Sequence, residues 1–256
     1  QISLEAFRQH VAPDDILVVN PSFSSHMLGL GVKCRKICYV QHFNTFEVID
    51  GFFDLYVSVS KFVARFLEQA YRIRTEIVWP FVMNAGARDD FPWFQRNTRV
   101  LVLQKGGAIV RPLLGELVSR FESSYGSLEN RIEMLPTGLP HPRVLEKFQE
   151  SRYCLGLSPC EGFGLMPVEA MAAGCTVVGF DGVGGRDHLR DGKNAAVVAY
   201  PDVGGLAARL HRVLSKDRWA EKLAKNGKAT AAQFCVARFY SEWSRILSRF
   251  VRQRVY

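Results

Sequence analysis

The chain has 256 residues, of which 48% are hydrophobic and 23% are charged. These values are close to the globular average, so a packed core is expected, and the length suffices for one large domain or two of ordinary size. The net charge of +8 favours anionic partners such as nucleotides, phospholipid headgroups or nucleic acid, without choosing among them.

The spacing of the cysteines and the length of the apolar runs bear on the cellular location of the protein. None of the six cysteines forms a CxxC pair, and no Cys/His cluster has zinc spacing, so the sequence predicts buried thiols, a reducing compartment and no bound metal. The longest nearly apolar run, residues 170–180, is far shorter than the ~20 residues of a spanning helix. We expect a cytoplasmic protein, with peripheral contact at the inner face of a membrane as the alternative.

The first part of the chain alternates strands with helices. A helix is expected at 61–71, with Ser60 as its cap. Such alternation predicts a parallel sheet, and ligands of these sheets bind beyond the carboxyl ends of the strands, where His42 lies. The predicted strands are 16–20, 36–41, 55–59 and 75–79.

Residues 84–97 break this pattern, because they contain Gly, Pro and charges without periodicity. We therefore predict a domain boundary there, followed by a second α/β domain. The expected parts are an N-terminal Rossmann-like domain at 1–83, a linker at 84–97, a C-terminal Rossmann-like domain at 98–236 and a final helix at 237–256.

The second domain repeats the strand and helix alternation. Its expected strands are 99–103, 131–135, 153–157, 176–180 and 195–198. Its expected helices are 111–121, 142–151, a helix from about Met166, and 203–215, 217–234 and 237–251.

A glycine loop joins the third of these strands to the helix at Met166. The loop reads Glu161-Gly162-Phe163-Gly164, and Pro167 suits the first helical position because its missing N–H would have no partner there. Free N–H groups and the helix dipole favour a phosphate at such a place. The spacing differs from GxGxxG and from a Walker loop, so neither redox nor ATPase chemistry is indicated.

Two carboxylates flank this loop with seven residues between them. Glu161 is either a ligand contact or a solvated loop carboxylate. Glu169 is either a ligand contact or the glutamate of a capping box, three residues after its cap, but a capping box requires Ser or Thr where Met166 stands.

Residues 161–165 and 169–174 closely resemble the E-x7-E signature of retaining glycosyltransferases with the GT-B fold, glycosyltransferase family 4 in particular. The resemblance covers most of 99–250 and, more weakly, 54–60 and 80–86. It implies an α/β fold of two Rossmann-like domains with parallel sheets flanked by helices. A full first domain of this fold begins with a further strand, glycine loop and helix, so the first domain here is expected to lack its leading half.

The resemblance also assigns roles to the loop. Glu161 would contact the hydroxyls of the donor sugar and is the expected catalytic carboxylate. Glu169 would contact the ribose of the nucleotide. The backbone of the loop would bind the sugar and diphosphate, through Gly162, Phe163, Gly164 and Leu165.

Three further residues match family positions. The family places an Arg and a Lys six residues apart to neutralise the diphosphate, and Lys105 and Arg111 keep that spacing with the two types exchanged. The alternative for this pair is an ordinary solvated surface. His42 matches a histidine near the donor sugar and acceptor, the alternative being a structural role.

The implied activity is sugar transfer from a UDP-, GDP- or ADP-linked donor to a saccharide or lipid-linked acceptor, with retention of configuration and no metal or other cofactor. The alternative is a nucleotide-sugar-binding fragment with little or no transfer activity. Nucleic-acid binding is not expected, because no aromatic-basic motif accompanies the positive charge. The helix at 237–251 carries an apolar stripe typical of a core face. Its arginines form either a solvated face or a contact for anionic lipid.

Overall fold

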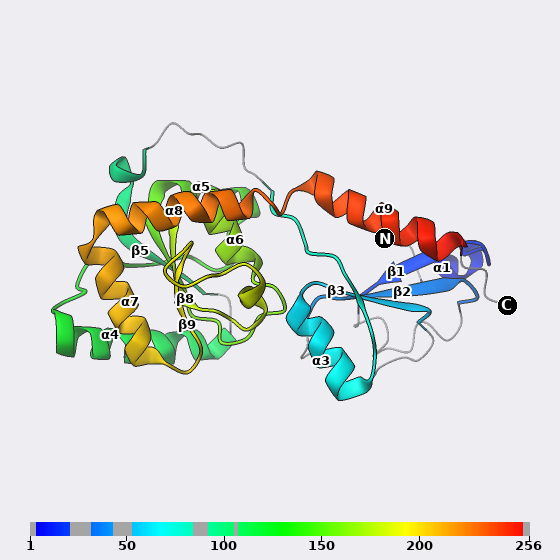
Figure 1. Ribbon diagram of the computed structural model, residues 1–256, viewed down its shortest axis with the longest axis horizontal. Helices are drawn as coiled ribbons and strands as arrows, with labels where there is room; N and C mark the ends of the chain where they lie inside the picture. The colour runs from blue at the N-terminus through cyan, green and yellow to red at the C-terminus, as the bar shows by residue number, and fades with distance from the viewer. Residues whose placement is uncertain (1–3, 21–31, 43–52, 84–91, 105–106, 253–256) are drawn as a thin grey trace. The chain divides into compact units, whose positions relative to one another are not determined.

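The computed structural model describes residues 4–20, 32–42, 53–83, 92–104 and 107–252. The chain divides into two compact units, Gln1–Trp79 with Arg245–Tyr256 and Pro80–Ser244. Of the expected linker at 84–97, residues 84–91 lie outside the described ranges and 92–97 belong to the second unit, while the last helix contributes residues to both units. Figure 1 shows the elements of each unit.

The first unit contains a parallel sheet of order β1-β2-β3-β4, confirming the expected strand arrangement. Helix α3 follows β3, and its cap is the predicted one, because the Ser60 side chain accepts from the Val63 N–H at 3.1 Å. The elements of this unit are α1 (Leu4–His10), β1 (Ile16–Val19), β2 (Arg35–Val40), β3 (Leu55–Ser58), α3 (Lys61–Tyr71) and β4 (Glu76–Ile77).

The fourth strand is shorter than the expected 75–79. It pairs with β3 at only two positions, and the Thr75 hydroxyl hydrogen-bonds the Ser58 hydroxyl at 2.7 Å instead of extending the ladder. The far end of α9 (Val236–Arg252) also belongs to this unit. There, Arg245 and Arg249 form ion pairs with Glu76 of β4. Two of the arginines considered for lipid contact therefore have a carboxylate partner within the protein.

The second unit is built on a parallel sheet of order β6-β5-β7-β8-β9. Helices α4 and α7 pack on one face, and α5, α6 and α8 cover the other (Figure 1). The strands are β5 (Asn97–Leu103), β6 (Ile132–Met134), β7 (Ser151–Gly156), β8 (Thr176–Phe180) and β9 (Ala196–Val198). The helices are α4 (Val110–Tyr125), α5 (His141–Glu150), α6 (Leu165–Ala172), α7 (Val203–Ser215) and α8 (Asp217–Ala231).

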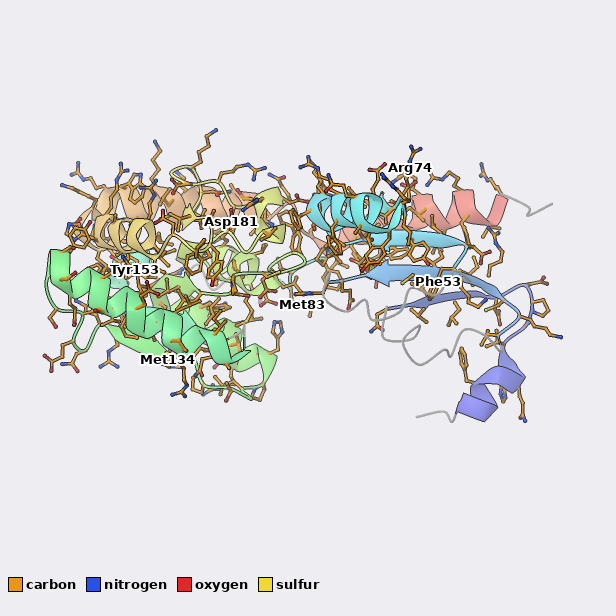
Figure 2. The ribbon with its side chains drawn as sticks, turned by 90° about the horizontal axis from the view of Figure 1, so that it is seen from below. Phe53, Arg74, Met83, Met134, Tyr153 and Asp181 are labelled. Carbon is orange, nitrogen blue, oxygen red and sulfur yellow. The ribbon has the colours of Figure 1, made fainter. Side chains whose placement is uncertain are left out.

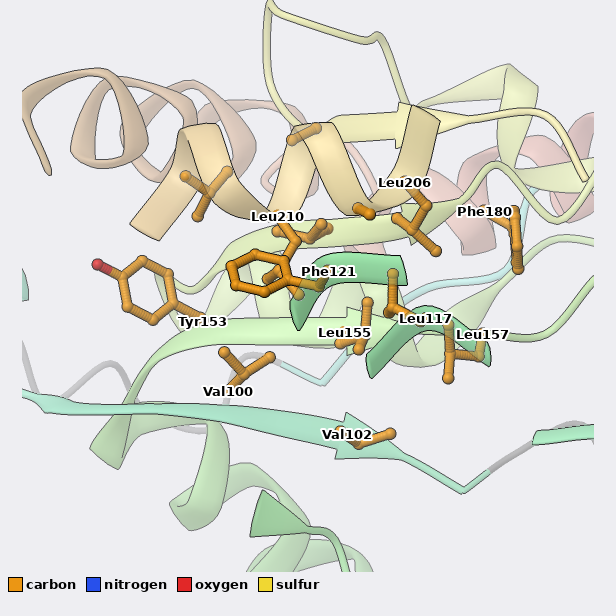
Figure 3. Close-up of a cluster of buried hydrophobic side chains, with 14 of the residues drawn as sticks. Val100, Val102, Leu117, Phe121, Tyr153, Leu155, Leu157, Phe180, Leu206 and Leu210 are labelled. Atoms are coloured by element: carbon orange, nitrogen blue, oxygen red, sulfur yellow. The ribbon is translucent and has the colours of Figure 1, made fainter. Parts of the chain in front are cut away.

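The main core lies between this sheet and the α4 and α7 layer (Figure 3). It consists of aliphatic and aromatic side chains that are nearly all less than 10% exposed, so the sheet is held rigidly behind its carboxyl edge. The labelled residues of this cluster are Val100, Val102, Leu117, Phe121, Tyr153, Leu155, Leu157, Phe180, Leu206 and Leu210.

The described end of the expected linker has structure of its own. Residues Trp93–Gln95 form a 3-10 helix, and β5 begins at Asn97 rather than at residue 99. Trp93 is buried, and its ring lies 5.6 Å from that of Tyr153 in an edge-on contact. Aromatic burial therefore attaches 92–97 to the second sheet, a contribution that local periodicity does not reveal.

Candidate functional site

The candidate site is an open pocket at the carboxyl edge of the second sheet. In the strand order, β6 and β7 lie on opposite sides of β5, so the connections reverse direction between β5 and β7. Ligands of open α/β sheets bind at such a reversal. The lining residues come from the ends of β5, β7 and β8 and the loops that follow them: Leu103, Gly156, Leu157, Ser158, Glu161, Gly164, Met166, Pro167, Phe180, Asp181, Gly182, Gly185 and Leu189.

Two glycine-containing loops form one wall through main-chain contacts. The Glu161 N–H donates to the Gly182 carbonyl at 2.7 Å, and the Gly184 N–H donates to the Glu161 carbonyl at 3.1 Å. A Cβ on Gly184 would overlap the Gly162 carbonyl oxygen, at a separation that no side chain tolerates. Glycine at 184 therefore serves this backbone contact, and the contact fixes where Glu161 sits on the wall.

The second of these loops contains a strained turn. Val183 has φ 65° and ψ −65°, and the Gly184 N–H donates to the Gly182 carbonyl at 2.8 Å, which closes a γ-turn of the rare positive-φ type. Asp181, the residue after β8 (labelled in Figure 2), supports the turn by accepting from the Val183 N–H at 3.0 Å. Such strain costs about 1–3 kcal/mol and concentrates at functional sites.

Helix α6 starts beside the pocket, but one residue earlier than expected. Its N-cap is Gly164, with φ 86° and ψ 64°, so Pro167 is the third helical residue rather than the first. Proline still fits there, because the first turn has no intrahelical partners for its N–H groups. The N–H groups of Gly164, Leu165 and Met166 have no partner within α6, and the helix dipole adds positive charge to them.

Glu169 is buried in the middle of α6 and binds a residue that the sequence did not single out. Its Oε1 lies 2.8 Å from Nε2 of His141, the first residue of α5. The capping-box interpretation is wrong for Glu169, because the cap is Gly164 and no side chain caps this helix. Nothing in the spacing signals the pair, since the partners are 28 residues apart on different helices.

The remaining predicted residues lie in different places. Arg111 is exposed in the first turn of α4, where no acidic residue accompanies it. The helix dipole disfavours an exposed cation there by only about 0.3–1 kcal/mol, so the diphosphate role of Arg111 stays a prediction. Lys105 lies outside the described residues. His42 is half-buried and follows β2 in the first unit, and Phe163, in the glycine loop, is buried.

His188 is a second residue that the sequence did not reveal. Its ring packs against Phe163, with the ring centroids 4.5 Å apart, and burial, aided by the positive charge of Arg190, lowers its pKa to about 3. Neither ring nitrogen finds a hydrogen-bond partner among the residues that the structure describes. His188 is therefore a neutral, buried imidazole that packs against Phe163 of the glycine loop.

Cysteine and metal chemistry are the other possibilities at this site. Burial and then the neighbouring Glu161 charge raise the pKa of the Cys160 thiol, so this cysteine is held protonated rather than as a thiolate nucleophile. In the described part of the chain, no three His, Cys, Asp or Glu side chains gather as a metal site. None of the helices within the described ranges is long and apolar enough to cross a membrane.

The fold of this chain is similar to that of solved glycosyltransferase structures. TarM from S. aureus, solved as a mutant in complex with fondaparinux, α-GlcNAc-glycerol and UDP, superposes on 94% of this chain and 57% of its own with a TM-score of 0.74 at 14% identity. Sucrose-phosphate synthase from Thermosynechococcus elongatus also gives 0.74, over 96% of this chain and 77% of its own, at 14% identity. The chain has the GT-B fold. The parallel sheets and flanking helices expected from the sequence are thereby confirmed.

Part of the second unit, which contains the pocket, is similar in sequence to known glycosyltransferases. Residues 127–230 match the family model of Glycosyl transferases group 1. EpsD of Bacillus subtilis (strain 168), a provisionally named glycosyltransferase, is 32% identical over 91 residues, which are 36% of this chain and 24% of EpsD. The poly(glycerol-phosphate) alpha-glucosyltransferase of the same strain is 24% identical over 110 residues, 43% of this chain and 16% of the enzyme. The chain thus matches less than a quarter of the length of these curated relatives.

Proposed function

We propose that this chain binds a nucleotide-sugar at the β5–β7 edge and transfers the sugar to an acceptor hydroxyl with retention of configuration. The observation that carries the proposal is the open start of α6 beside Glu161, in the region matched by the group 1 family model. A phosphate fits such a helix start without other special features. Retention, and the assignment to family 4, rest on the E-x7-E resemblance.

The proposed donor lies along the pocket wall. Its diphosphate contacts the N–H groups at the start of α6, with Arg111 and Lys105 supplying positive charge. Glu161 contacts the sugar hydroxyls from the wall formed with Gly182 and Gly184, while Gly162, Phe163 and Leu165 give the loop its shape. Glu169 accepts hydrogen bonds from the ribose, and His42 acts near the transferred sugar and its acceptor.

The chemistry follows from where charge develops. The bond between the anomeric carbon and the diphosphate breaks, so negative charge grows on the leaving phosphate while positive charge grows on the sugar ring. The α6 start and the two cations stabilise the phosphate, which lowers the barrier because they are already oriented. The acceptor attacks from the same face, so Glu161 acts by positioning and electrostatics and not as a nucleophile. The proposed reaction needs no metal.

Among nucleotides, we propose UDP. TarM was solved with UDP, and the Anabaena Alr3699/HepE structure, with a TM-score of 0.71 at 16% identity over 91% of this chain and 78% of its own, contains UDP and glucose. The proposed acceptor is a saccharide or a lipid-linked saccharide. The proposed location is the cytoplasm or the inner face of a membrane.

A ligand panel tests the proposal. UDP, GDP, ADP and their glucose conjugates are compared with uridine alone by thermal shift. A ligand at one hundred times its Kd adds about 2.7 kcal/mol, roughly 5–10 °C in Tm for a unit of this size. Transfer to saccharide acceptors is then measured for the wild type, for Glu161→Gln and for the surface control Glu116→Gln, whose carboxylate pairs with Arg120.

The expected result is a shift with UDP and UDP-glucose, transfer by the wild type and by Glu116→Gln, and loss of transfer in Glu161→Gln. A shift without transfer would leave a nucleotide-sugar-binding module. No shift with any diphosphate would refute the donor site itself.

A further inference from the structure

The contact between His141 and Glu169 joins two helices on the same face of the second sheet. His141 begins α5, immediately after the loop that leaves β6, and Glu169 lies in α6, which follows β7. Strand β5 separates β6 from β7 in the sheet, so the contact bridges the two sides of the strand-order reversal. It therefore lies at the part of the unit where the donor is proposed to bind.

The two partners differ in exposure. The Glu169 side chain is 11% exposed and the His141 side chain is 48% exposed. A carboxylate this buried requires hydrogen-bond donors, and the 2.8 Å distance from Oε1 to Nε2 supplies one. The imidazole can donate from Nε2 whether it is neutral or protonated, so the contact holds in either state.

The hydrogen bond leaves the carboxylate with capacity for a ligand. A carboxylate offers about four acceptor positions on its two oxygens, and His141 occupies one of them. The side chain of glutamate is otherwise free to rotate about several bonds, so a fixed partner decides which positions remain available. Two adjacent hydroxyl donors, such as the 2′ and 3′ groups of a ribose, match the positions that remain.

We propose that His141 is a positioning residue that orients the Glu169 carboxylate toward the ribose hydroxyls of the donor nucleotide. The inference rests on the proposed function and adds a residue to it from a different helix. Its alternative is a purely structural link between α5 and α6. The two differ in one respect: only the positioning role depends on the hydroxyl groups of the ligand.

Calorimetry with two probes separates these roles. UDP and 2′,3′-dideoxy-UDP are titrated into the wild-type chain, His141→Ala, His141→Gln and Glu169→Gln. His211→Ala is the matched control, because His211 is another partly exposed histidine of the same unit and stacks on Tyr125 at 4.2 Å. Circular dichroism confirms that each variant is folded.

We expect His141→Ala to weaken UDP about tenfold, as for the loss of one hydrogen bond to a charged group, and to leave dideoxy-UDP unchanged. His141→Gln should recover part of the loss, because its amide N–H can replace Nε2–H, and His211→Ala should bind both probes as the wild type does. Equal losses for both probes, or none for UDP, would overturn the positioning role. If Glu169→Gln still loses affinity for UDP but not for dideoxy-UDP, the proposed donor site stands even though the role of His141 has failed. If the wild type binds no UDP, the proposed function fails and this inference with it.

Discussion

Replacing His188 by leucine tests whether the imidazole packed against the glycine loop is neutral in the folded protein. Burial lowers the pKa of the folded His188 to about 3, against an ordinary value of 6.5, so the unfolded chain binds the extra proton first as pH falls. The free energy of unfolding is therefore not reduced by His188 above pH 6.5, and it decreases progressively as the pH falls from 6.5 toward 3. Each pH unit within this window corresponds to up to about 1.4 kcal/mol, which gives about 2 kcal/mol between pH 7.5 and pH 5.0.

The assay is urea unfolding at these two pH values, followed by circular dichroism. His188→Leu should lose about 2 kcal/mol less than the wild type on acidification, because the other titrating groups are the same in both chains. Its stability at pH 7.5 should not fall, since no described residue bonds the ring nitrogens. His211→Leu is measured in parallel, as the same substitution at another histidine of this unit, which stacks on Tyr125. Equal acid sensitivity in His188→Leu and the wild type would refute a buried neutral imidazole.

Two backbone positions and one helix cap give further predictions. Gly184→Ala should cost about 3 kcal/mol of unfolding free energy, because its Cβ would overlap the Gly162 carbonyl oxygen. Gly115→Ala, within α4 and with nothing within 4 Å of the added methyl, should instead gain roughly 0.5–1 kcal/mol. Similar urea midpoints for the two would contradict the reasoning. Ser60→Ala should cost about 1 kcal/mol through the lost cap, and unchanged urea unfolding would show that the bond to Val63 contributes nothing.

Local signals predicted the regular elements well. Helix α3 has the bounds that Ser60 and the apolar spacing indicated, and β8 and α7 also match their predicted ranges. The predictions failed where contacts between residues distant in sequence determine the structure. The fourth strand pairs with β3 at only two positions, and Thr75, expected to be its first residue, instead hydrogen-bonds the Ser58 hydroxyl. Trp93 joins the second unit through Tyr153, which is 60 residues away in sequence.

The site was predictable only in part for the same reason. The pocket-lining positions of Glu161 and Gly164 follow from the loop sequence and from its place after a strand. The partner of Glu169 does not, because His141 reaches it from another helix. His188 could not be predicted either, since its low pKa arises mainly from burial in the folded protein, where Phe163 and Phe234 pack against its ring, with a smaller contribution from the charge of Arg190. The roles of His42, Lys105 and Arg111 stay predictions.

The main-chain bonds between Glu161, Gly182 and Gly184 have a consequence for enzymology. Because these bonds are made by main-chain carbonyl and N–H groups, any residue at position 161 can keep them. Glu161→Gln, Glu161→Asp and Glu161→Ala thus form a graded series on one fixed backbone. Differences in turnover along the series then report the charge of the side chain (Gln), its length (Asp) and the presence of its carboxylate (Ala). Rearrangement of the loop should contribute little to them.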